Sequence, residues 1–214
     1  MLEVDHIEVK RAQHSFNFDF SLPTHHILLM TGPSGVGKST LLDTLAGFLL
    51  PLRGSIRWNR RAIHELTPER RPISSLFQAN NLFEHLSVHQ NLRLALGKNV
   101  ESHWLSAVQA LDLESHLDKR PGQLSGGQRQ RVALITTVLR PEPLLLMDEP
   151  FSELDPLTRT RSIEWCLRQF VKGGKTIVLV SHQQEDIDQL KSLPHQLLSL
   201  SSTTLTSSGF SVSR

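Results

Sequence analysis

A glycine-rich segment near the start of the chain has the residue types that bind phosphate. It reads Gly32-Pro33-Ser34-Gly35-Val36-Gly37-Lys38-Ser39 and continues into Thr40. Glycines let the backbone turn its N–H groups toward an anion, and a helix that begins near Lys38 adds the positive end of its dipole. The lysine supplies a point charge for β- and γ-phosphates, and the Ser39 hydroxyl is a suitable ligand for Mg²⁺. An ordinary glycine turn before a helix would explain the glycines but not Lys38 and Ser39.

Two adjacent acids follow an apolar segment much later in the chain. The run Leu144-Leu145-Leu146-Met147 is typical of a strand buried on both faces of a parallel sheet, and Asp148 and Glu149 follow it directly. Carboxylates in that position are costly unless they serve a ligand. Consecutive strand residues point to opposite sides, which suits two acids with different tasks. Alone, the acids could be a solvated strand end before a turn; with a phosphate loop upstream, a ligand-binding pair is favoured.

A third motif, Leu124-Ser125-Gly126-Gly127-Gln128, lies between the other two. Ser125, Gly126 and Gly127 stand at the start of a predicted helix over 126–139, so they form a second anion-binding arrangement. One chain cannot easily bring both anion sites to one nucleotide if they lie on separate lobes. Two chains related by a twofold axis can do so head to tail, which gives two shared sites.

Strands and helices alternate around these motifs. Apolar runs predict buried strands at 27–31, 73–77, 144–147 and 176–180, and helical spacing predicts helices at 38–48, 126–139 and 156–170. Residues 80–117 have helical periods with few strand signals, which indicates a helical insertion. The tail from Ser199 onward is rich in Ser and Thr and is compatible with short edge strands or partial disorder.

Composition restricts the possible functions. Lys and Arg number 23 against 21 Asp and Glu, a net charge of +2 that is too balanced to argue for a nucleic-acid partner. The single cysteine, Cys166, excludes an internal disulfide and fits a reducing compartment. The N-terminus does not have the pattern of a secretory signal, and no segment approaches the ~20 apolar residues that cross a bilayer. A membrane role would therefore require a separate partner chain.

The three motifs, in this order, resemble the ATP-binding subunit of ABC transporters over nearly the whole chain. The resemblance implies an α/β fold, a P-loop NTPase (RecA-like) core with a predominantly parallel sheet, N-terminal antiparallel strands and an inserted helical subdomain. The chain would be one domain over 1–214, with the helical subdomain at approximately 80–137. ATP and Mg²⁺ are the implied cofactors.

The resemblance also implies roles for single residues. Asp148 holds Mg²⁺ together with Ser39 and Gln78, Glu149 is the general base, and His182 contacts the γ-phosphate. Without the resemblance, Gln78 would be interpreted as a solvated loop residue. His182 would be a histidine without a functional role, beside a serine, Ser181, that caps a helix. The signature motif Leu124–Gln128 would act on the ATP of a partner subunit. Asp155, in Ser152-Glu153-Leu154-Asp155, would cross toward that partner.

The chain departs from the family pattern at two places. Family members usually stack an aromatic residue on adenine before the phosphate loop, and this chain has no tyrosine. Spacing favours Arg11, whose guanidinium plane can stack on a base, with His14 and Phe16 as alternatives. His25-His26 replaces the Gly-Glu that commonly precedes the first core strand, and a surface turn is expected there. No metal pattern is evident in the other histidines: His85 and His89 are four apart but lack a third ligand.

A free-standing cassette with one set of motifs most resembles a bacterial importer subunit. The segment between Lys38 and Leu124 is too compact for the DNA-repair and chromosome-structure ATPases that share the signature. The stretches 69–73 and 76–88 are similar to thiamine-importer ATPases. The alternatives are the ATPase of an iron(III), polyamine or molybdate importer, a non-transport ABC ATPase, and a cassette that binds ATP without hydrolysing it. Expected partners are a second copy upon ATP binding, membrane permease subunits and a solute-binding protein, at the cytoplasmic face of the inner membrane. Leu82, Phe83 and Leu86 are expected to receive the permease, unless they belong to the core.

Overall fold

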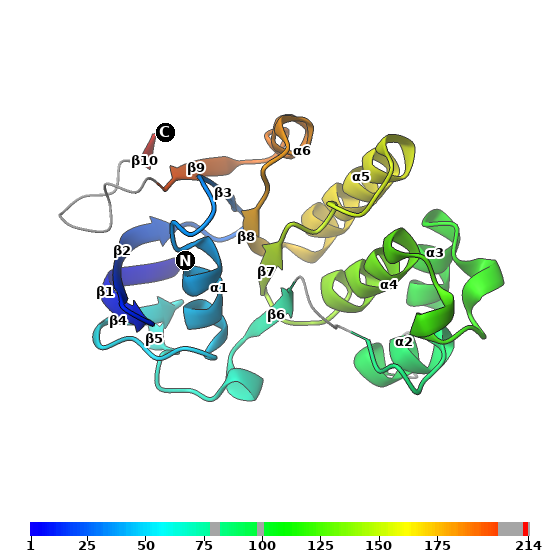
Figure 1. The fold of residues 1–214 in the computed structure, drawn as a ribbon, viewed down its shortest axis with the longest axis horizontal. Coiled ribbons are helices and arrows are strands. Elements are labelled where there is room, and N and C mark those ends of the chain that lie inside the picture. The colour runs from blue at the N-terminus through cyan, green and yellow to red at the C-terminus, as the bar shows by residue number, and fades with distance from the viewer. Residues whose placement is uncertain (78–81, 98–100, 201–211, 214) are drawn as a thin grey trace.

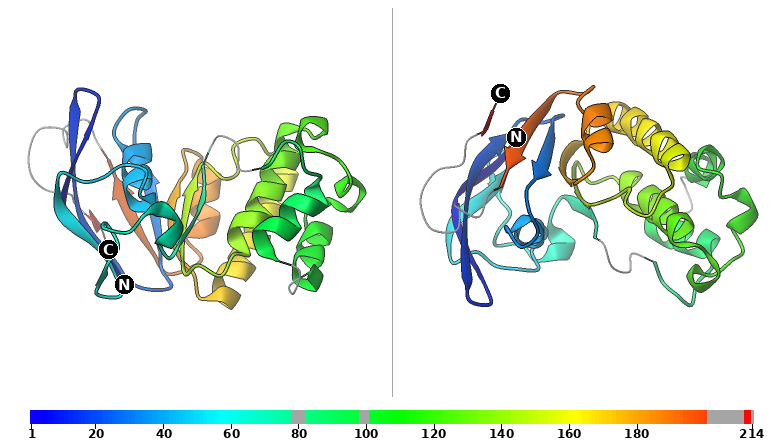
Figure 2. Two further views of the ribbon diagram at one scale, coloured as in Figure 1. Left: turned by 90° about the horizontal axis from the view of Figure 1, so that it is seen from below. Right: turned by 45° about the horizontal axis from the view of Figure 1, so that its top comes forward.

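The computed structural model describes residues 1–77, 82–97, 101–200 and 212–213. Two sheets lie side by side at one end of the molecule, and a group of helices lies at the other end (Figure 1). The larger sheet occupies the middle, so that it contacts both the smaller sheet and the helices. The two further views preserve this order (Figure 2).

The six-stranded sheet has the order β10-β9-β3-β8-β7-β6. All neighbouring pairs are parallel except β9 and β10, which are antiparallel. The predicted strands at 27–31 and 176–180 are confirmed to the residue, while the strands predicted at 73–77 and 144–147 each differ by one residue at the end. The strands are β3 (Ile27–Thr31), β6 (Ile73–Leu76), β7 (Leu144–Asp148), β8 (Thr176–Val180), β9 (His195–Ser199) and β10 (Val212–Ser213).

The four-stranded sheet is antiparallel and has the order β2-β1-β4-β5. Side chains alternate between buried and exposed along β2, because one face of this sheet covers the core and the other meets solvent. A bulge between Val4 and Ile7 places His6 at a φ of 45° and bends β1. The strands are β1 (Leu2–Arg11), β2 (His14–Leu22), β4 (Arg53–Trp58) and β5 (Arg61–Ala62).

Helices cover both faces of the parallel sheet. Leu28 and Val178 face α1 and the antiparallel sheet, whereas Leu29 and Leu179 on the same strands face the layer of α4, α5 and α6. This period-two division explains why the strands read as continuous apolar runs. The helices are α1 (Lys38–Ala46), α2 (Val88–Leu96), α3 (Glu101–Ala110), α4 (Gly126–Val138), α5 (Pro156–Gly173) and α6 (Gln184–Leu190).

The helices α2, α3 and α4 pack on one another at the end opposite the antiparallel sheet (Figure 1). Trp104 of α3 is fully buried there, and its ring centroid lies 5.3 Å from that of His89 in a T-shaped arrangement. Two short 3₁₀ turns, Glu114–His116 and Pro121–Gln123, lead from α3 into α4. The predicted subdomain limits of 80 and 137 stay a prediction.

A buried arginine fixes the end of α1. The helix ends at Ala46, two residues before the predicted limit of 48, because Gly47 follows in the left-handed conformation. The Arg71 guanidinium donates to the carbonyl oxygens of Thr44 and Leu45, both at 2.7 Å, and also to those of Leu66 and His64 at 3.1 Å. A cation at the C-terminal end of a helix is favourable because it meets the negative end of the dipole. Burial lowers the pKa of Arg71 from its ordinary value.

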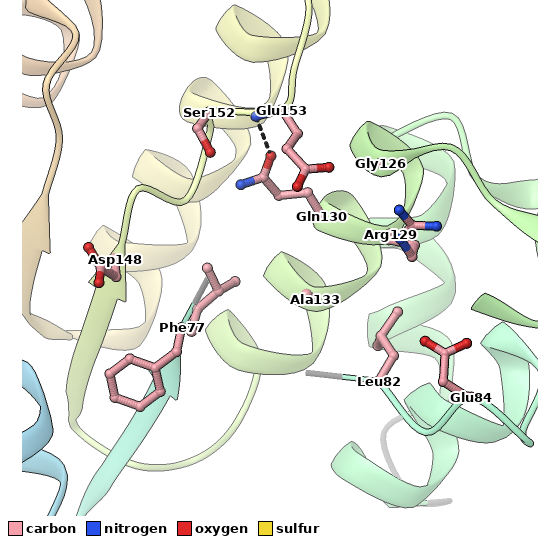
Figure 3. Close-up of a pocket in the computed structure, with 11 residues that line it drawn as sticks. Phe77, Leu82, Glu84, Gly126, Arg129, Gln130, Ala133, Asp148, Ser152 and Glu153 are labelled. Carbon is pink, nitrogen blue, oxygen red and sulfur yellow. Dashed lines mark hydrogen bonds between the residues drawn. The ribbon is translucent and has the colours of Figure 1, made fainter. Parts of the chain in front are cut away.

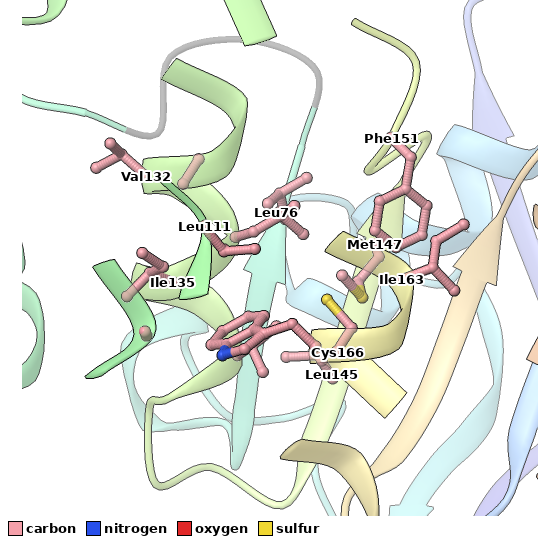
Figure 4. Packing of buried hydrophobic residues seen from close by; sticks show 14 of the residues in the cluster. Leu76, Leu111, Val132, Ile135, Leu145, Met147, Phe151, Ile163 and Cys166 are labelled. Carbon is pink, nitrogen blue, oxygen red and sulfur yellow. The ribbon is translucent and has the colours of Figure 1, made fainter. Parts of the chain in front are cut away.

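The core continues from the sheet into the helical layer. Met147 of β7 lies among Phe151, Ile163 and Cys166 (Figure 4). Cys166 is fully buried, and burial raises the pKa of its thiol. Over the described ranges, none of the helices combines the length and apolar character needed to span a bilayer.

Candidate functional site

The glycine-rich segment forms an open loop between β3 and α1. Gly32, Gly35 and Gly37 have φ values of 137°, 81° and 105°, which L side chains rarely adopt. A Cβ atom on Gly37 would lie 2.5 Å from the Phe16 ring, so this position also lacks the space for a side chain. The N-cap of α1 is Gly37, which has no side chain to cap the helix. The first N–H groups of the helix are therefore available to an anion.

Lys38, the first residue of α1, folds back over the loop. Its ammonium donates to the carbonyl oxygens of Gly32 at 2.7 Å and Pro33 at 2.8 Å. Burial lowers the pKa of Lys38, and the charges of Asp148 and Glu149 oppose that shift. The carbonyl groups thus hold the cation beside the loop that it is expected to serve.

Ser39 and Asp148 bring two oxygen donors together from different elements. The Ser39 hydroxyl, on α1, donates to Asp148 Oδ2, at the end of β7, over 3.1 Å. Burial raises the pKa of Asp148, and the negative charge of Glu149 adds to this, against the opposing effects of Ser39 and Lys38. A hard divalent cation prefers such oxygen ligands and would stabilise the ionised carboxylate. The pair fits the predicted Mg²⁺ site, whereas the third predicted ligand, Gln78, lies outside the described residues.

Glu149 and His182 meet across neighbouring strand ends. Because β7 and β8 are adjacent and parallel, the residues that follow them emerge at the same edge, and His182 Nε2 lies 3.2 Å from Glu149 Oε1. Glu149 has a φ of 48°, an uncommon backbone conformation for a non-glycine residue, and its N–H donates to the Val180 carbonyl at 3.0 Å. Strained backbone of this kind is concentrated at functional sites.

These groups share one cleft of about 540 Å³. The cleft brings together the phosphate loop, the two acids and the histidine that the sequence analysis singled out. It is lined by Arg11, Ala12, His14, Phe16, Ser34, Gly35, Gly37, Lys38, Ser39, Thr40, Asp148, Glu149 and His182.

All three candidates for adenine stacking line that cleft. Arg11 and His14 flank the turn between β1 and β2, and Phe16 follows on β2. The Arg11 guanidinium is half-exposed and donates to Asp43 Oδ2 of α1 at 2.6 Å. The choice among the three stays a prediction.

The signature motif is built differently. Ser125 is the N-cap of α4: its hydroxyl accepts the Gln128 N–H at 3.2 Å, and the Gln128 side chain accepts the Ser125 N–H at 2.9 Å. This reciprocal capping box fixes the start of the helix. The amide of Gln128 also lies 2.9 Å from His116 Nε2, and burial lowers the pKa of that histidine.

Gly126 opens onto a second, smaller pocket of about 260 Å³, which separates α4 from the ends of β6 and β7 (Figure 3). Ser152 and Glu153 line it from one side, and Leu82 and Glu84 from the other. Asp148 lines both this pocket and the phosphate cleft. Within the described part of the chain, the start of α1 and the start of α4 therefore line two different cavities.

Asp155 has a defined task within its own chain. Its side chain accepts the Thr158 N–H at 3.1 Å and caps α5, and this hydrogen bond lowers the pKa of Asp155. The prediction that Asp155 extends toward a partner subunit is not tested by this contact.

Sequence reasoning missed two polar residues that organise the segment after Glu149. Gln130 of α4 donates to the Glu149 carbonyl at 3.1 Å and accepts the Glu153 N–H at 2.8 Å. Arg159 of α5 donates to the carbonyl oxygens of Phe151 at 3.3 Å and Leu154 at 3.0 Å, and to the Gln183 side chain. Both read in the sequence as ordinary polar residues on helices, and only the fold reveals their partners.

The residues next to His182 form part of the same network. Ser181 donates to Asp186 at 2.8 Å and accepts the Gln183 N–H at 3.1 Å. Asp186 is buried, and burial raises its pKa while Ser181 and the nearby Arg159 lower it. The loop that carries His182 is thus tied to the loop that follows Glu149 through Arg159.

The segment before α2 presents one exposed aromatic ring. Phe83 is 53% exposed, whereas Leu82 packs against the core. Of the three residues predicted to receive the permease, Leu82 is therefore part of the core packing. Asn91, a buried side chain of α2, accepts the Phe83 N–H at 2.7 Å and donates to the carbonyl oxygens of Phe83, Leu86 and Ser87. One amide therefore holds the whole loop in place.

His85 and His89, which are four apart in the sequence, contact other side chains in the structure. His89 Nε2 lies 3.2 Å from Glu101, and the His85 ring packs against that of Phe83. His25 adopts a φ of 64° in the turn between β2 and β3, as expected for a surface turn.

Comparison with known proteins identifies the family of the chain. A family model described as ABC transporter matches residues 16–152. The thiamine import ATP-binding protein ThiQ of Vibrio cholerae serotype O1 is 40% identical over 192 residues, which cover 87% of this chain and 81% of that protein. The protein of the same name from Yersinia pestis is 43% identical over 175 residues, with 79% and 74% covered.

Solved structures show the same fold. The ATP-binding cassette MJ0796, in a dimeric post-hydrolysis state with ADP and Pi, superimposes with a TM-score of 0.81 at 24% identity, covering 94% of each chain. A structure described as the ATP binding subunit of an ABC transporter gives a TM-score of 0.80 at 26% identity, covering 94% of this chain and 85% of the other. The chain therefore belongs to the ABC transporter family, as a cassette that binds and hydrolyses ATP.

Proposed function

We propose that this chain is the ATPase subunit of a bacterial importer, and that thiamine or a related small solute is the transported compound. The proposal rests on relatives named as thiamine import proteins at 40% and 43% identity. Importers of iron(III), polyamines or molybdate, and a non-transport ABC ATPase, are the alternatives. The solute does not contact this subunit, so its side chains hold no recognition chemistry for it.

In this proposal each group in the cleft has one role. Lys38 and the loop amides bind the β- and γ-phosphates, Glu149 accepts the proton of the attacking water, and His182 contacts the γ-phosphate. Ser39, Asp148 and Gln78 would hold Mg²⁺, which neutralises phosphate charge when it is bound. The 3.2 Å contact between His182 and Glu149 supports a joint role at the reacting phosphate.

The observation that carries the proposed dimer is the separation of the two helix starts. The α1 start lines the phosphate cleft and the α4 start lines the second pocket, so a second copy would have to complete each ATP site. ATP would then stabilise a closed dimer, and hydrolysis would release it.

Light scattering on purified protein tests the dimer. The Glu149→Gln variant with ATP should give a dimer, and adding Ser125→Arg should abolish it, because the longer side chain occupies the start of α4. Ser106→Arg, on the exposed face of α3, is the matched control and should leave the dimer intact. A stable dimer without nucleotide, through another surface, would contradict the proposal.

We propose that Phe83 lies where the permease docks, with the chain bound peripherally at the cytoplasmic face of the membrane. An exposed aromatic ring on a rigid loop is a suitable anchor for a partner. Phe83→Asp should abolish co-purification with the permease while the isolated subunit keeps its basal ATPase rate. Val171→Asp, 67% exposed on α5, should change neither property. If folding and basal hydrolysis fall together in Phe83→Asp, the docking site lies elsewhere.

The solute is tested by uptake. Cells that depend on this transporter should accumulate labelled thiamine, delivered by a solute-binding protein, and Glu149→Gln should remove that uptake. Uptake that is instead competed by ferric iron, a polyamine or molybdate would transfer the assignment to that importer class, with the ATPase chemistry unchanged.

A further inference from the structure

The Gln130 side chain connects α4, the helix that begins at the signature motif, with the loop that follows β7 and begins at Glu149. It lies on α4, one turn after the signature glycines, and points toward the loop after β7 (Figure 3). Its amide nitrogen donates to the Glu149 carbonyl at 3.1 Å, and its amide oxygen accepts the Glu153 N–H at 2.8 Å. Both ends of the amide are therefore engaged with the same loop.

The signature glycines bring this loop close to α4. A Cβ atom on Gly127 would lie 3.0 Å from the Glu153 carbonyl oxygen and 3.3 Å from the Leu154 side chain. A Cβ atom on Gly126 would lie 2.0 Å from the Glu153 carboxylate. The first turn of α4 is therefore in close contact with residues 153–154 at Gly127, so that a shift of α4 is passed to the loop.

Among the described residues, four hydrogen bonds hold the backbone of Glu149. Its N–H is bound to the Val180 carbonyl, and its own carbonyl accepts from Gln130 and from the N–H and hydroxyl of Ser152. Ser152 belongs to the same loop, so Gln130 is the donor that comes from a separate helix. At a φ of 48°, Glu149 depends on such contacts to stay in its conformation.

We propose that Gln130 is a positioning residue that links the signature helix to the catalytic base of the same subunit. This inference rests on the proposed roles of Glu149 as the base and of the signature motif as the site for a partner's ATP. When the partner's ATP fixes the start of α4, Gln130 fixes the Glu149 carbonyl and thereby the direction of its carboxylate. Hydrolysis in one site then depends on occupancy of the other.

The first test separates positioning from binding. Gln130→Met keeps the length and helix propensity of the side chain but removes both hydrogen bonds. We expect kcat to fall by ~10- to 100-fold, because a small misplacement of a reacting group has effects of this size. KM for ATP and the ATP-dependent dimer, measured by light scattering, should change less than about twofold. Gln109→Met, at an exposed site on α3, is the matched control.

Two outcomes would overturn the proposal. One is a kcat in Gln130→Met equal to that of the Gln109→Met control. The other is a joint loss of kcat, ATP affinity and thermal stability, which would mean that Gln130 only supports the fold. A dimer that forms with ATP but turns over slowly is the expected signature of the positioning role.

A double-variant cycle tests whether Gln130 acts through Glu149. In the Glu149→Gln background, adding Gln130→Met should lower the residual turnover by less than about twofold, because the group to be positioned is already absent. A full multiplicative loss would overturn the proposal. If Glu149→Gln alone keeps wild-type turnover, the assignment of the base fails instead, so the two failures are distinguishable. Gln130→Glu keeps the acceptor for Glu153 but not the donor for Glu149, and it should be as slow as Gln130→Met.

Discussion

The two glycine-rich helix starts of this molecule use glycine for different physical reasons. At α1 the glycines adopt φ values of 137°, 81° and 105°, and the N-cap is itself a glycine, Gly37, with no side chain to cap the helix. At α4 neither Gly126 nor Gly127 has a positive φ, and Ser125 caps the helix through a capping box. In the first region glycine permits a backbone conformation; in the second it permits the close approach of residues 153–154.

This difference separates the two predicted anion sites. At the α1 start the N-cap is Gly37, which has no side chain to occupy the first N–H groups, and this suits the predicted binding of a phosphate within one chain. The α4 start is already ordered by its own cap and packed against the loop that carries Glu149. It is therefore suited to receive a group from outside and to pass that contact on to the same subunit's active site.

The largest expected effect is on ATP turnover and comes from a residue in the cleft at the start of α1. Glu149→Gln keeps the size of the side chain but removes its ability to accept a proton, so turnover should fall by ~10²- to 10⁴-fold. ATP binding should persist, because the phosphate loop is unchanged. Steady-state hydrolysis and nucleotide titration measure the two properties separately, and near wild-type turnover would show that another group is the base.

Substitution of a glycine by alanine should lower the free energy of unfolding more at the start of α1 than at the start of α4. Gly37→Ala places a Cβ at a φ of 105° and 2.5 Å from the Phe16 ring, so it should lower the free energy of unfolding by about 2–5 kcal/mol. Gly126→Ala meets only the flexible end of Glu153, and alanine favours helix, so its effect should stay within about 1 kcal/mol. Urea unfolding measures both, and equal losses would refute the distinction.

Removal of the cap at α4 should have a smaller effect on stability, with a matched control in α2. Ser125 and Ser87 both cap a helix through a reciprocal box with glutamine, so either change to alanine should lower the free energy of unfolding by ~1 kcal/mol. Only Ser125→Ala should also weaken the ATP-dependent dimer. Equal dimer formation in the two variants would mean that the Ser125 hydroxyl serves its own helix alone.

The smallest effect concerns the pH dependence of stability. The pKa of Asp148 is raised in the folded protein, chiefly by burial, so the folded state binds more protons than the unfolded state between the unfolded-state pKa, ~3.8, and the higher folded-state pKa. Stability should therefore fall as the pH rises through the folded-state pKa, and stay reduced above it. In nucleotide-free protein at neutral pH, Asp148→Asn should slightly raise the midpoint of thermal unfolding and flatten its pH dependence.

The contradictory result would be a lower midpoint for Asp148→Asn at neutral pH. Such a loss would mean that the ionised carboxylate is stabilised by its neighbours, Ser39 and Lys38, more than burial destabilises it. Thermal scans between pH 4 and 8 are sufficient, and they need no nucleotide.

The central strands were predictable from sequence because burial on both faces leaves only apolar residues. The strand at 27–31 and the start of α1 at Lys38 follow from local signals and agree with the structure. The strand His195–Ser199 and the helix Gln184–Leu190 were not predicted, since the strand is partly exposed and the helix is short. Helix α5 extends three residues beyond the predicted limit of 170, until Gly174 ends it in the left-handed conformation.

The site was predictable only where the motif itself carries the chemistry. The presence of Lys38, Asp148 and Glu149 in one cleft follows from motif and strand order. The pairing of Arg11 with Asp43 and the two-ended contact of Gln130 do not follow, because both join residues far apart in the sequence. A polar residue on a helix carries no local signal of its partner, so such contacts have to be read from the fold.

The Asn91 amide has a consequence for the speed of assembly. Its four hydrogen bonds hold the loop from Phe83 to Ser87 in a single arrangement before any partner arrives. A surface that is already ordered loses little conformational entropy on association, and encounters need not wait for a rearrangement. The permease docking proposed at this loop should therefore resemble lock-and-key recognition, with association rates set by diffusion and orientation.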